Sequence, residues 1–213
     1  IVTNIPKEIR KDLYLLQGYL HKQGHNNEER VWMYFAVFPI YIRYEEKRMY
    51  TRKPKYYTPE YVINKRRGVC RDYSSTFQKL CQLSNIPCIQ VVGKTPFRII
   101  PFIKSLLHFV MPTTRHAWCV VRIKGRWMLM DPTWAKVKEI KKYYKLDRNG
   151  NKKTIGKCKV VDRSYYDTNP YLCARYHKPF HAAFYLMNEV PTYKSSLKFL
   201  RKTPRARAKV EKL

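Results

Sequence analysis

Cys70 is the residue of this 213-residue chain whose surroundings best suit a chemical reaction. A cysteine reacts as its thiolate, so a reactive thiol must lose its proton more readily than a free one, whose pKa is about 8.5. The partial positive charge of a helix N-terminus favours the thiolate, and the apolar spacing after Cys70 predicts that this residue begins a helix. Gly68 lets the backbone approach closely just before it. Basic neighbours add positive charge, opposed in part by Asp72; they are Arg66, Arg67 and Arg71.

A thiol nucleophile also needs an imidazole that a third polar group orients, and the sequence offers His116 and Asp131 for these roles. Two strands, 116–124 and 126–131, are predicted to form a hairpin that turns at Lys124-Gly125. With that turn, alternation places His116 and Asp131 on one sheet face as diagonal neighbours. A three-residue turn would reverse the parity and leave a surface histidine and an ordinary Asp-Pro turn opener.

Other segments must hold these side chains in place. Apolar residues at helical spacing predict helices over 6–23, with Pro6 in the first turn, and over 28–40, with Asn27 as N-cap. Thr58 precedes a short third helix that ends near Gly68, and the nucleophile helix covers 71–85. Residues 45–57 are predicted to be a loop, 88–93 a strand, and 136–159 two further strands joined at Asn149-Gly150.

Taken together, these segments resemble the transglutaminase-like superfamily over roughly residues 6–135. Gly68-Val-Cys-Arg-Asp-Tyr-Ser74 is similar to the family's nucleophile motif, and Asn85 to Gly93 to its following strand. Arg115 to Trp127 and Met128 to Trp134 are similar to its His and Asp motifs. The resemblance implies an α+β fold with a papain-like core, in which the nucleophile helix packs on an antiparallel sheet.

The same resemblance implies residue roles: Cys70 as nucleophile, His116 as general base and acid, and Asp131 as its orienting partner. The reaction would be acyl transfer through a thioester, with the Cys70 backbone N–H as one oxyanion donor. Many members carry a Trp shortly before the Ile-x-Tyr segment, where this sequence has Val37 or Phe38. Asn64 is the candidate for the second donor.

Three functions fit these residues. The first is a cysteine peptidase or amidase acting on a protein or peptide substrate. The second is a protein-glutamine transglutaminase, since hydrolysis and transamidation differ in which nucleophile reaches the thioester. The third is a catalytically silent basic module that binds nucleic acid or another polyanion, motivated by a formal net charge of +29. The chain has six cysteines but no C-x-x-C pair, so we expect no metal and no cofactor, while a disulfide such as Cys158–Cys173 stays open.

The excess charge lies largely outside the catalytic motifs. Residues 136–163 and 194–213 hold 19 of the 44 basic residues and four of the 15 acidic ones. We predict a single domain over 1–193, with core motifs in 58–135, a basic β-rich extension over 136–193 and a flexible basic tail over 194–213.

Two further features are left with alternatives. The apolar segment 94–114 is either a buried element or a lid beside the substrate, and it is too short and too interrupted by prolines and charges to span a bilayer. The first residue is Ile rather than Met, which is compatible with a processed or secreted form and equally with a cytoplasmic one.

Overall fold

The computed structural model describes residues 2–49, 55–96, 113–146 and 152–186. The chain divides into two compact units, the first comprising Ile1–Val92 and Arg115–Thr168 and the second Gly93–Thr114 and Asn169–Leu213. All three candidate catalytic residues belong to the first unit. The extent of the predicted single domain over 1–193 stays a prediction.

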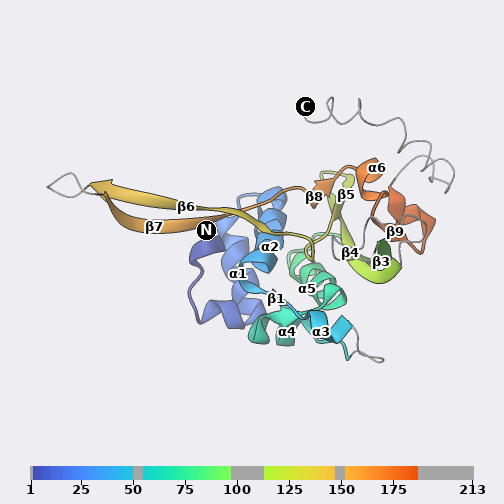
Figure 1. Ribbon diagram of the computed structural model, residues 1–213, viewed down its shortest axis with the longest axis horizontal. Helices are drawn as coiled ribbons and strands as arrows, with labels where there is room; N and C mark the ends of the chain where they lie inside the picture. Colours follow the sequence, from blue (N-terminus) through green and yellow to red (C-terminus); the bar gives the residue numbers. More distant parts are fainter. Residues whose placement is uncertain (1, 50–54, 97–112, 147–151, 187–213) are drawn as a thin grey trace, which may run out of the picture. The chain divides into compact units, whose positions relative to one another are not determined.

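The first unit is α+β, as predicted, with its helices preceding most of its strands (Figure 1). Its α-helices are α1 (Leu13–Gln23), α2 (Asn27–Tyr41), α3 (Glu46–Met49), α4 (Pro59–Lys65) and α5 (Cys70–Gln82). Two 3-10 turns, η1 (Val2–Asn4) and η2 (Ile9–Lys11), lie before α1. The short strands β1 (Arg43–Tyr44) and β2 (Arg67–Gly68) pair in parallel, with Tyr44 opposite Gly68.

The predicted helix 6–23 is wrong at its beginning. The α-helix starts at Leu13, because the Asp12 side chain accepts the backbone N–H groups of Tyr14 and Leu15, both at 2.9 Å. A cap satisfies donors that a helix N-terminus leaves unpaired, so it fixes the start of the helix better than a proline in the preceding turn.

Two other boundaries also differ from the sequence prediction. The N-cap of α2 is Asn26 rather than Asn27, since the Asn26 side chain accepts the Glu29 N–H at 3.0 Å. The predicted loop 45–57 contains the helical turn α3, and its residues 50–54 lie outside the described part of the chain. By contrast, the Thr58 cap is confirmed, because its side chain accepts the Tyr61 N–H at 3.3 Å.

The main sheet carries the order β8-β5-β4-β3 in the first unit, formed by β3 (Cys88–Pro96), β4 (Thr113–Ile123), β5 (Arg126–Met130) and β8 (Tyr166–Thr168). In the second unit the end of β3 pairs with β9 (Lys178–Pro179), and α6 (Pro170–Cys173) and the 3-10 turn η4 (Ala182–Tyr185) belong there too. A separate pair, β6 (Val137–Leu146) and β7 (Lys152–Val161), forms the predicted basic hairpin.

The β4–β5 hairpin has the two-residue turn that the sequence predicts. Ile123 pairs with Arg126, so Lys124 and Gly125 make the turn, with φ of 49° and 80°. Positive φ at both positions is the geometry that matches the twist of a hairpin. This register continues so that His116 and Asp131 fall on the same face.

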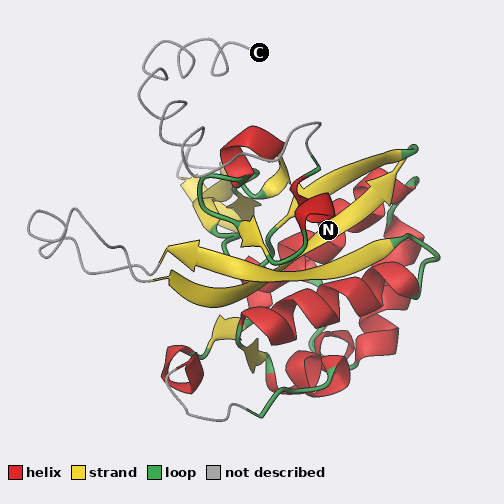
Figure 2. Ribbon diagram, turned by 90° about the vertical axis from the view of Figure 1, so that its right-hand side faces the viewer, coloured by secondary structure: helices red, strands yellow, loops and turns green. Residues whose placement is uncertain are grey.

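Helix α5 is fixed from two sides. Phe77 lies edge-on to Phe35 and Phe38 of α2, with ring centroids 6.3 and 6.1 Å apart. On the other side the Cys119 thiol of β4 donates to the Ser74 carbonyl at 3.3 Å. Figure 2 shows helices lying against the sheet. The nucleophile helix therefore packs between the helical layer and the antiparallel sheet, as predicted.

Three of the predictions concern residues that the structure does not describe. These are the apolar segment over 97–112, the Asn149-Gly150 turn and the tail over 194–213. All six cysteines are free thiols, so the suggested disulfide between Cys158 and Cys173 is not formed. None of the helices in the described ranges has the length and apolar character that crossing a membrane requires.

The corrected start of α1 can be tested by substitution. We expect Asp12→Ala to lower the free energy of unfolding by about 1 kcal/mol, because two helix N–H groups lose their acceptor. Glu8→Ala is the matched control, since Glu8 makes no side-chain cap bond, and should change stability by less than about 0.5 kcal/mol. Equal losses in urea denaturation would contradict the assignment of Asp12 as the cap.

Candidate active site at the start of helix α5

Cys70 is the first residue of α5 and is half-buried. The N-cap is Val69, whose extended backbone leads into the helix. A carboxylate takes the part of a capping side chain here, because the Val69 N–H donates to Asp72 Oδ2 at 2.9 Å. Cys70 therefore stands at the positive end of the dipole of a 13-residue helix.

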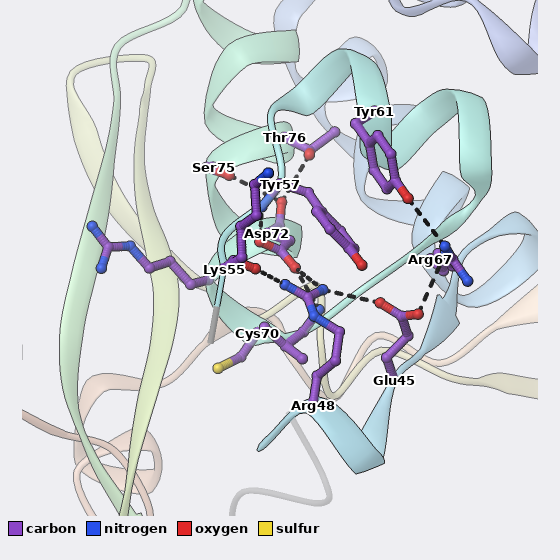
Figure 3. A network of polar contacts seen from close by, with 12 residues as sticks. Glu45, Arg48, Lys55, Tyr57, Tyr61, Arg67, Cys70, Asp72, Ser75 and Thr76 are labelled. Atoms are coloured by element: carbon purple, nitrogen blue, oxygen red, sulfur yellow. Dashed lines mark hydrogen bonds and ion pairs between the residues drawn. The ribbon is translucent and has the colours of Figure 1, made fainter. Parts of the chain in front are cut away.

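Asp72 is the residue that sequence analysis undervalued. It is 1% exposed, and its two oxygens bind three different groups. Oδ2 accepts from Arg48 Nη1 at 2.8 Å as well as from Val69, and Oδ1 accepts from the Tyr57 N–H at 2.9 Å. Figure 3 shows these bonds meeting at the Asp72 carboxylate, while the Cys70 sulfur points away from it. Asp72 thus ties the start of α5 to two segments that precede α4.

Gly68 is required by this arrangement. A Cβ at residue 68 would come within 2.8 Å of Asp72 Cβ and 3.2 Å of its Oδ2. The glycine of the nucleophile motif therefore makes room for a buried carboxylate, a sharper reason than general backbone flexibility.

Arg48 extends the network outward. Its guanidinium lies over the Tyr57 ring at 3.6 Å, pairs with Glu45 at 2.9 Å and donates to the Lys55 carbonyl. Glu45 also meets Arg67 Nε at 3.4 Å. The position of Asp72 in the first turn of a helix was a readable capping signal. The pairing with Arg48 is a tertiary contact across 24 positions, and no local pattern announces it.

The structure brings His116 and Asp131 together. His116 Nε2 and Asp131 Oδ2 are 2.7 Å apart, and the residues are 5% and 3% exposed. Asp131 Oδ1 accepts the backbone N–H groups of Thr133 and Trp134 at 2.9 and 3.3 Å. The aspartate therefore caps the turn before Pro132 and orients the histidine at the same time. The sequence left open whether Asp131 orients His116 or caps a turn. Asp131 does both, with a different oxygen for each role.

Aromatic rings hold the imidazole. Trp134 stacks on His116 with centroids 5.4 Å apart, and Trp118 lies roughly parallel to it at 6.1 Å. Trp134 is held in turn by the edge contact of Tyr165 at 5.2 Å. These rings restrict rotation of the imidazole, so its two nitrogens keep distinct directions.

The charge state of His116 follows from opposing effects. Burial lowers the pKa of its imidazole, but the negative charge and hydrogen bond of Asp131 raise it, and a hydrogen bond with the Cys70 thiol raises it further, to about 10. Because Asp131 bonds Nε2, the ring nitrogen on the other side, Nδ1, is the one that can meet the thiol. His116 is thus held as an imidazolium beside Cys70 at neutral pH.

Tyr44 is a second residue that sequence analysis did not assign. Burial raises the pKa of its phenol, the charge of the neighbouring Cys70 thiol raises it further, and a hydrogen bond with the Cys70 backbone opposes these effects. The phenol therefore stays protonated beside Cys70. Its place on β1, opposite Gly68, brings it there. The sequence Ile42-Arg43-Tyr44 resembles a family segment, but the resemblance did not indicate that Tyr44 lies beside Cys70. That position follows from the pairing of β1 with β2.

Asn64 lies elsewhere. It is exposed on α4, and its side-chain amide donates to the Lys11 carbonyl at 3.4 Å. The Asn64 amide, which was predicted to stabilise an oxyanion, is therefore bound to the Lys11 carbonyl instead. A groove of about 740 Å³ is also separate from the thiol: α2 and β7 line it, and Cys70, His116 and Asp131 do not.

A buried His–Asp pair on an antiparallel sheet, set against a helix that begins with Cys, defines the papain-like class of α+β fold. The model of the transglutaminase-like superfamily matches residues 20–132, which is more than half of the chain. The chain belongs to the transglutaminase-like superfamily. Membership supports a thiol-dependent function in general terms.

More specific relatives are distant. The chain is 23% identical over 126 residues to kyphoscoliosis peptidase of Mus musculus and 24% identical over 115 residues to that of Homo sapiens. These matches cover 59% and 54% of this chain, but the chain spans less than a fifth of either relative's length, 18% and 17%.

Among solved structures, a candidate cysteine protease from Cytophaga hutchinsonii matches 79% of this chain and 59% of its own, at 18% identity and a TM-score of 0.42. A transglutaminase matches 62% of this chain and 34% of its own, at 17% identity and a TM-score of 0.44. A second family model, described as DNA-binding protein VF530, matches residues 183–213.

The role of Asp72 in holding the nucleophile turn is testable through stability. Asp72→Asn removes a buried carboxylate and leaves the half-buried Arg48 without its full counter-charge, so we expect the free energy of unfolding to fall by about 3 kcal/mol. The matched control is Glu139→Gln, which removes the carboxylate of an exposed pair with Lys141 at 3.8 Å and should cost less than about 0.5 kcal/mol. A small effect of Asp72→Asn in chemical denaturation would contradict the importance of this ion pair.

The raised pKa of His116 is testable by NMR. We expect its ring to stay protonated at pH 8 and to titrate near pH 10, because Asp131 outweighs burial. In Asp131→Asn burial acts with less opposition, so the pKa should fall far below 10. The remaining histidines of the same spectra serve as internal controls.

This pKa also has a consequence for stability. The folded value of about 10 lies above the ordinary value of 6.5, so the stabilising contribution of His116 is complete below pH 6.5 and is lost as the pH rises through 10. The stability difference between the wild type and Asp131→Asn should therefore shrink across that window. A difference that grows with pH would refute the assignment.

Proposed function

We propose that the chain is a thiol-dependent acyl-transfer enzyme that hydrolyses an amide bond in a protein or peptide. The observation that carries the proposal is the buried His116–Asp131 pair. Asp131 raises the pKa of the His116 imidazole, and a hydrogen bond with Cys70 raises it further. Structural sites also contain buried ion pairs, but this one faces a half-buried thiol at a helix N-terminus.

In the proposed reaction the Cys70 thiolate attacks the amide carbonyl carbon, and a C–S bond forms as the carbonyl electrons move to oxygen. When the intermediate collapses, the C–N bond breaks and the His116 imidazolium gives its proton to the departing amine. Water then attacks the thioester while the neutral His116 takes its proton. Loss of the Cys70 thiolate releases the acid and restores the imidazolium, so protons and electrons balance over the cycle.

We assign the oxyanion donors to the Cys70 backbone N–H and the Tyr44 phenol. The Tyr44 phenol is half-buried, protonated and next to Cys70, which are the properties of a donor to charge that develops beside the sulfur. Tyr44 thus takes the place of Asn64 as the proposed second oxyanion donor. Asp131 acts through His116 by fixing its orientation, and is a positioning residue.

Hydrolysis is preferred to transamidation because both curated relatives are named as peptidases. Transamidation by a protein-glutamine transglutaminase is the second candidate, since an amine can reach the same thioester in place of water. The third, a module without catalysis, predicts that Cys70 behaves as an ordinary thiol.

Labelling with iodoacetamide at pH 6 tests the thiolate. We expect Cys70 to be alkylated at least tenfold faster than Cys158, the other half-buried cysteine, because an ordinary thiol is almost fully protonated at that pH. His116→Ala should remove this advantage. Uniformly slow alkylation of all six cysteines would support the silent module.

Product analysis separates the two reactions. With a glutamine-containing peptide and a fluorescent amine, a hydrolase should release free acid in excess of the amine adduct, whereas a transglutaminase should form mainly the adduct. Tyr44→Phe should lower kcat at least tenfold without slowing alkylation of Cys70, because it removes a donor used after attack on the carbonyl. An unchanged kcat would remove Tyr44 from the oxyanion site.

A further inference from the structure

The β6–β7 ribbon is the largest element of the first unit that the proposed chemistry does not use. Its two antiparallel strands, Val137–Leu146 and Lys152–Val161, form a sheet of their own (Figure 1). An isolated two-stranded hairpin is marginally stable in water, so such an element is retained when something packs on it or binds to it. Among the ribbon residues whose burial is described, Val161 at the end of β7 joins the core that α2 helps to form.

The ribbon is strongly basic. Residues 137–161 contain nine basic and two acidic residues. Lys142 lies directly opposite Lys157, a cross-strand pair of like charges, which is unfavourable unless an anion lies between or above them. Glu139 is the acidic residue among the ribbon side chains in the described ranges, and it pairs with Lys141 at 3.8 Å. The other lysines are not neutralised by it.

The ribbon also exposes apolar and aromatic surface. Ile140, Tyr143 and Tyr144 are 56%, 52% and 51% exposed. Tyr143 and Tyr144 are consecutive in β6, where the register of the ribbon shifts: Tyr143 pairs with Gly156 and Tyr144 with Thr154. Tyr143 pairs with Gly156, where a Cβ would meet the ring at 3.9 Å. The absence of a side chain at Gly156 leaves one face of that strand open beside the ring.

We propose that the β6–β7 ribbon binds single-stranded nucleic acid. Lysine ammonium groups would contact the phosphates, and the Tyr143 and Tyr144 rings would stack on unpaired bases. Every base has a flat π-face that matches an exposed tyrosine, whereas an acidic peptide offers charge without that surface. A membrane surface would favour a larger apolar face than Ile140, Tyr143 and Tyr144 provide in a ribbon with nine basic residues.

The ribbon site is independent of the thiol. Its residues lie outside 20–132, the range that matches the superfamily, and its two strands form a sheet separate from the one that carries His116. Cys70→Ala should therefore bind nucleic acid as the wild type does, and ribbon variants should keep the rapid alkylation of Cys70. Failure of either proposal leaves the other standing.

The test is fluorescence anisotropy of the full chain with a labelled 20-nucleotide single strand of mixed sequence, at several salt concentrations. Tyr143→Ala and Tyr144→Ala should each weaken binding roughly tenfold through loss of stacking. Lys142→Ala with Lys157→Ala should reduce the slope of log K against log salt by about 1.4, since each phosphate contact on a single strand contributes about 0.7.

Matched controls come from α1, where Tyr14 is 55% exposed and Lys22 is also exposed. Tyr14→Ala and Lys22→Ala should leave binding unchanged. Because the ribbon side chains are exposed, their variants should keep the wild-type melting temperature, and loss of the like-charge pair should not lower it.

Four results would overturn the proposal. They are an unchanged affinity in both tyrosine variants, equal losses in the α1 controls, tighter binding of a duplex of the same sequence, and full competition by a polyglutamate of equal charge. The last two would mean that the ribbon recognises charge density without unpaired bases.

Discussion

The Asp72 carboxylate is the constraint on which the candidate site depends most. It is buried, and a buried charge is costly unless every lone pair is used. The cost is offset because Arg48 supplies the counter-charge and two backbone N–H groups, from Tyr57 and Val69, supply hydrogen bonds. Removing any one of these donors leaves the others bound to an under-compensated anion. The network therefore specifies one arrangement of the chain around the start of α5.

Asp131 repeats this solution on the sheet side. Each aspartate binds both a cation and backbone N–H groups. Asp72 pairs with Arg48 and accepts from Val69 and Tyr57, and Asp131 pairs with His116 and accepts from Thr133 and Trp134. One carboxylate fixes the backbone from which Cys70 projects, and the other fixes the imidazole that faces it. Since helix and sheet are joined through the Ser74–Cys119 contact, the two fixed ends are held at a defined separation. Packing and these two carboxylates thus hold the thiol and the imidazole near each other.

The parts of the site that could be predicted depend on residues near one another in the sequence, whereas the parts that could not be predicted depend on distant segments. The His116–Asp131 pairing followed from alternation and from a two-residue turn whose Gly125 accepts positive φ, and both are local properties. Cys70 was a candidate because a predicted helix begins there among basic residues, and the family resemblance implied its role as nucleophile. The contacts of Arg48 and Tyr44 could not be derived, because they depend on how segments 24 or more positions away pack on the motif. The start of α1 was missed for a local reason: proline in a first turn was weighted above a capping aspartate that bonds two N–H groups.

The distribution of charge separates the two proposed activities. Around Cys70 most charges are paired, Arg48 and Arg67 with Glu45 and Asp72, and His116 with Asp131, while Arg71 lies over the Tyr56 ring. A balanced, partly buried site interacts with its substrate through short-range contacts, because opposite charges close together cancel at a distance. The ribbon has no such balance, and its field extends over about a Debye length, ~8 Å at physiological salt. We therefore relate the net charge of +29 to the binding proposed for the ribbon, and the paired charges at α5 to the proposed chemistry.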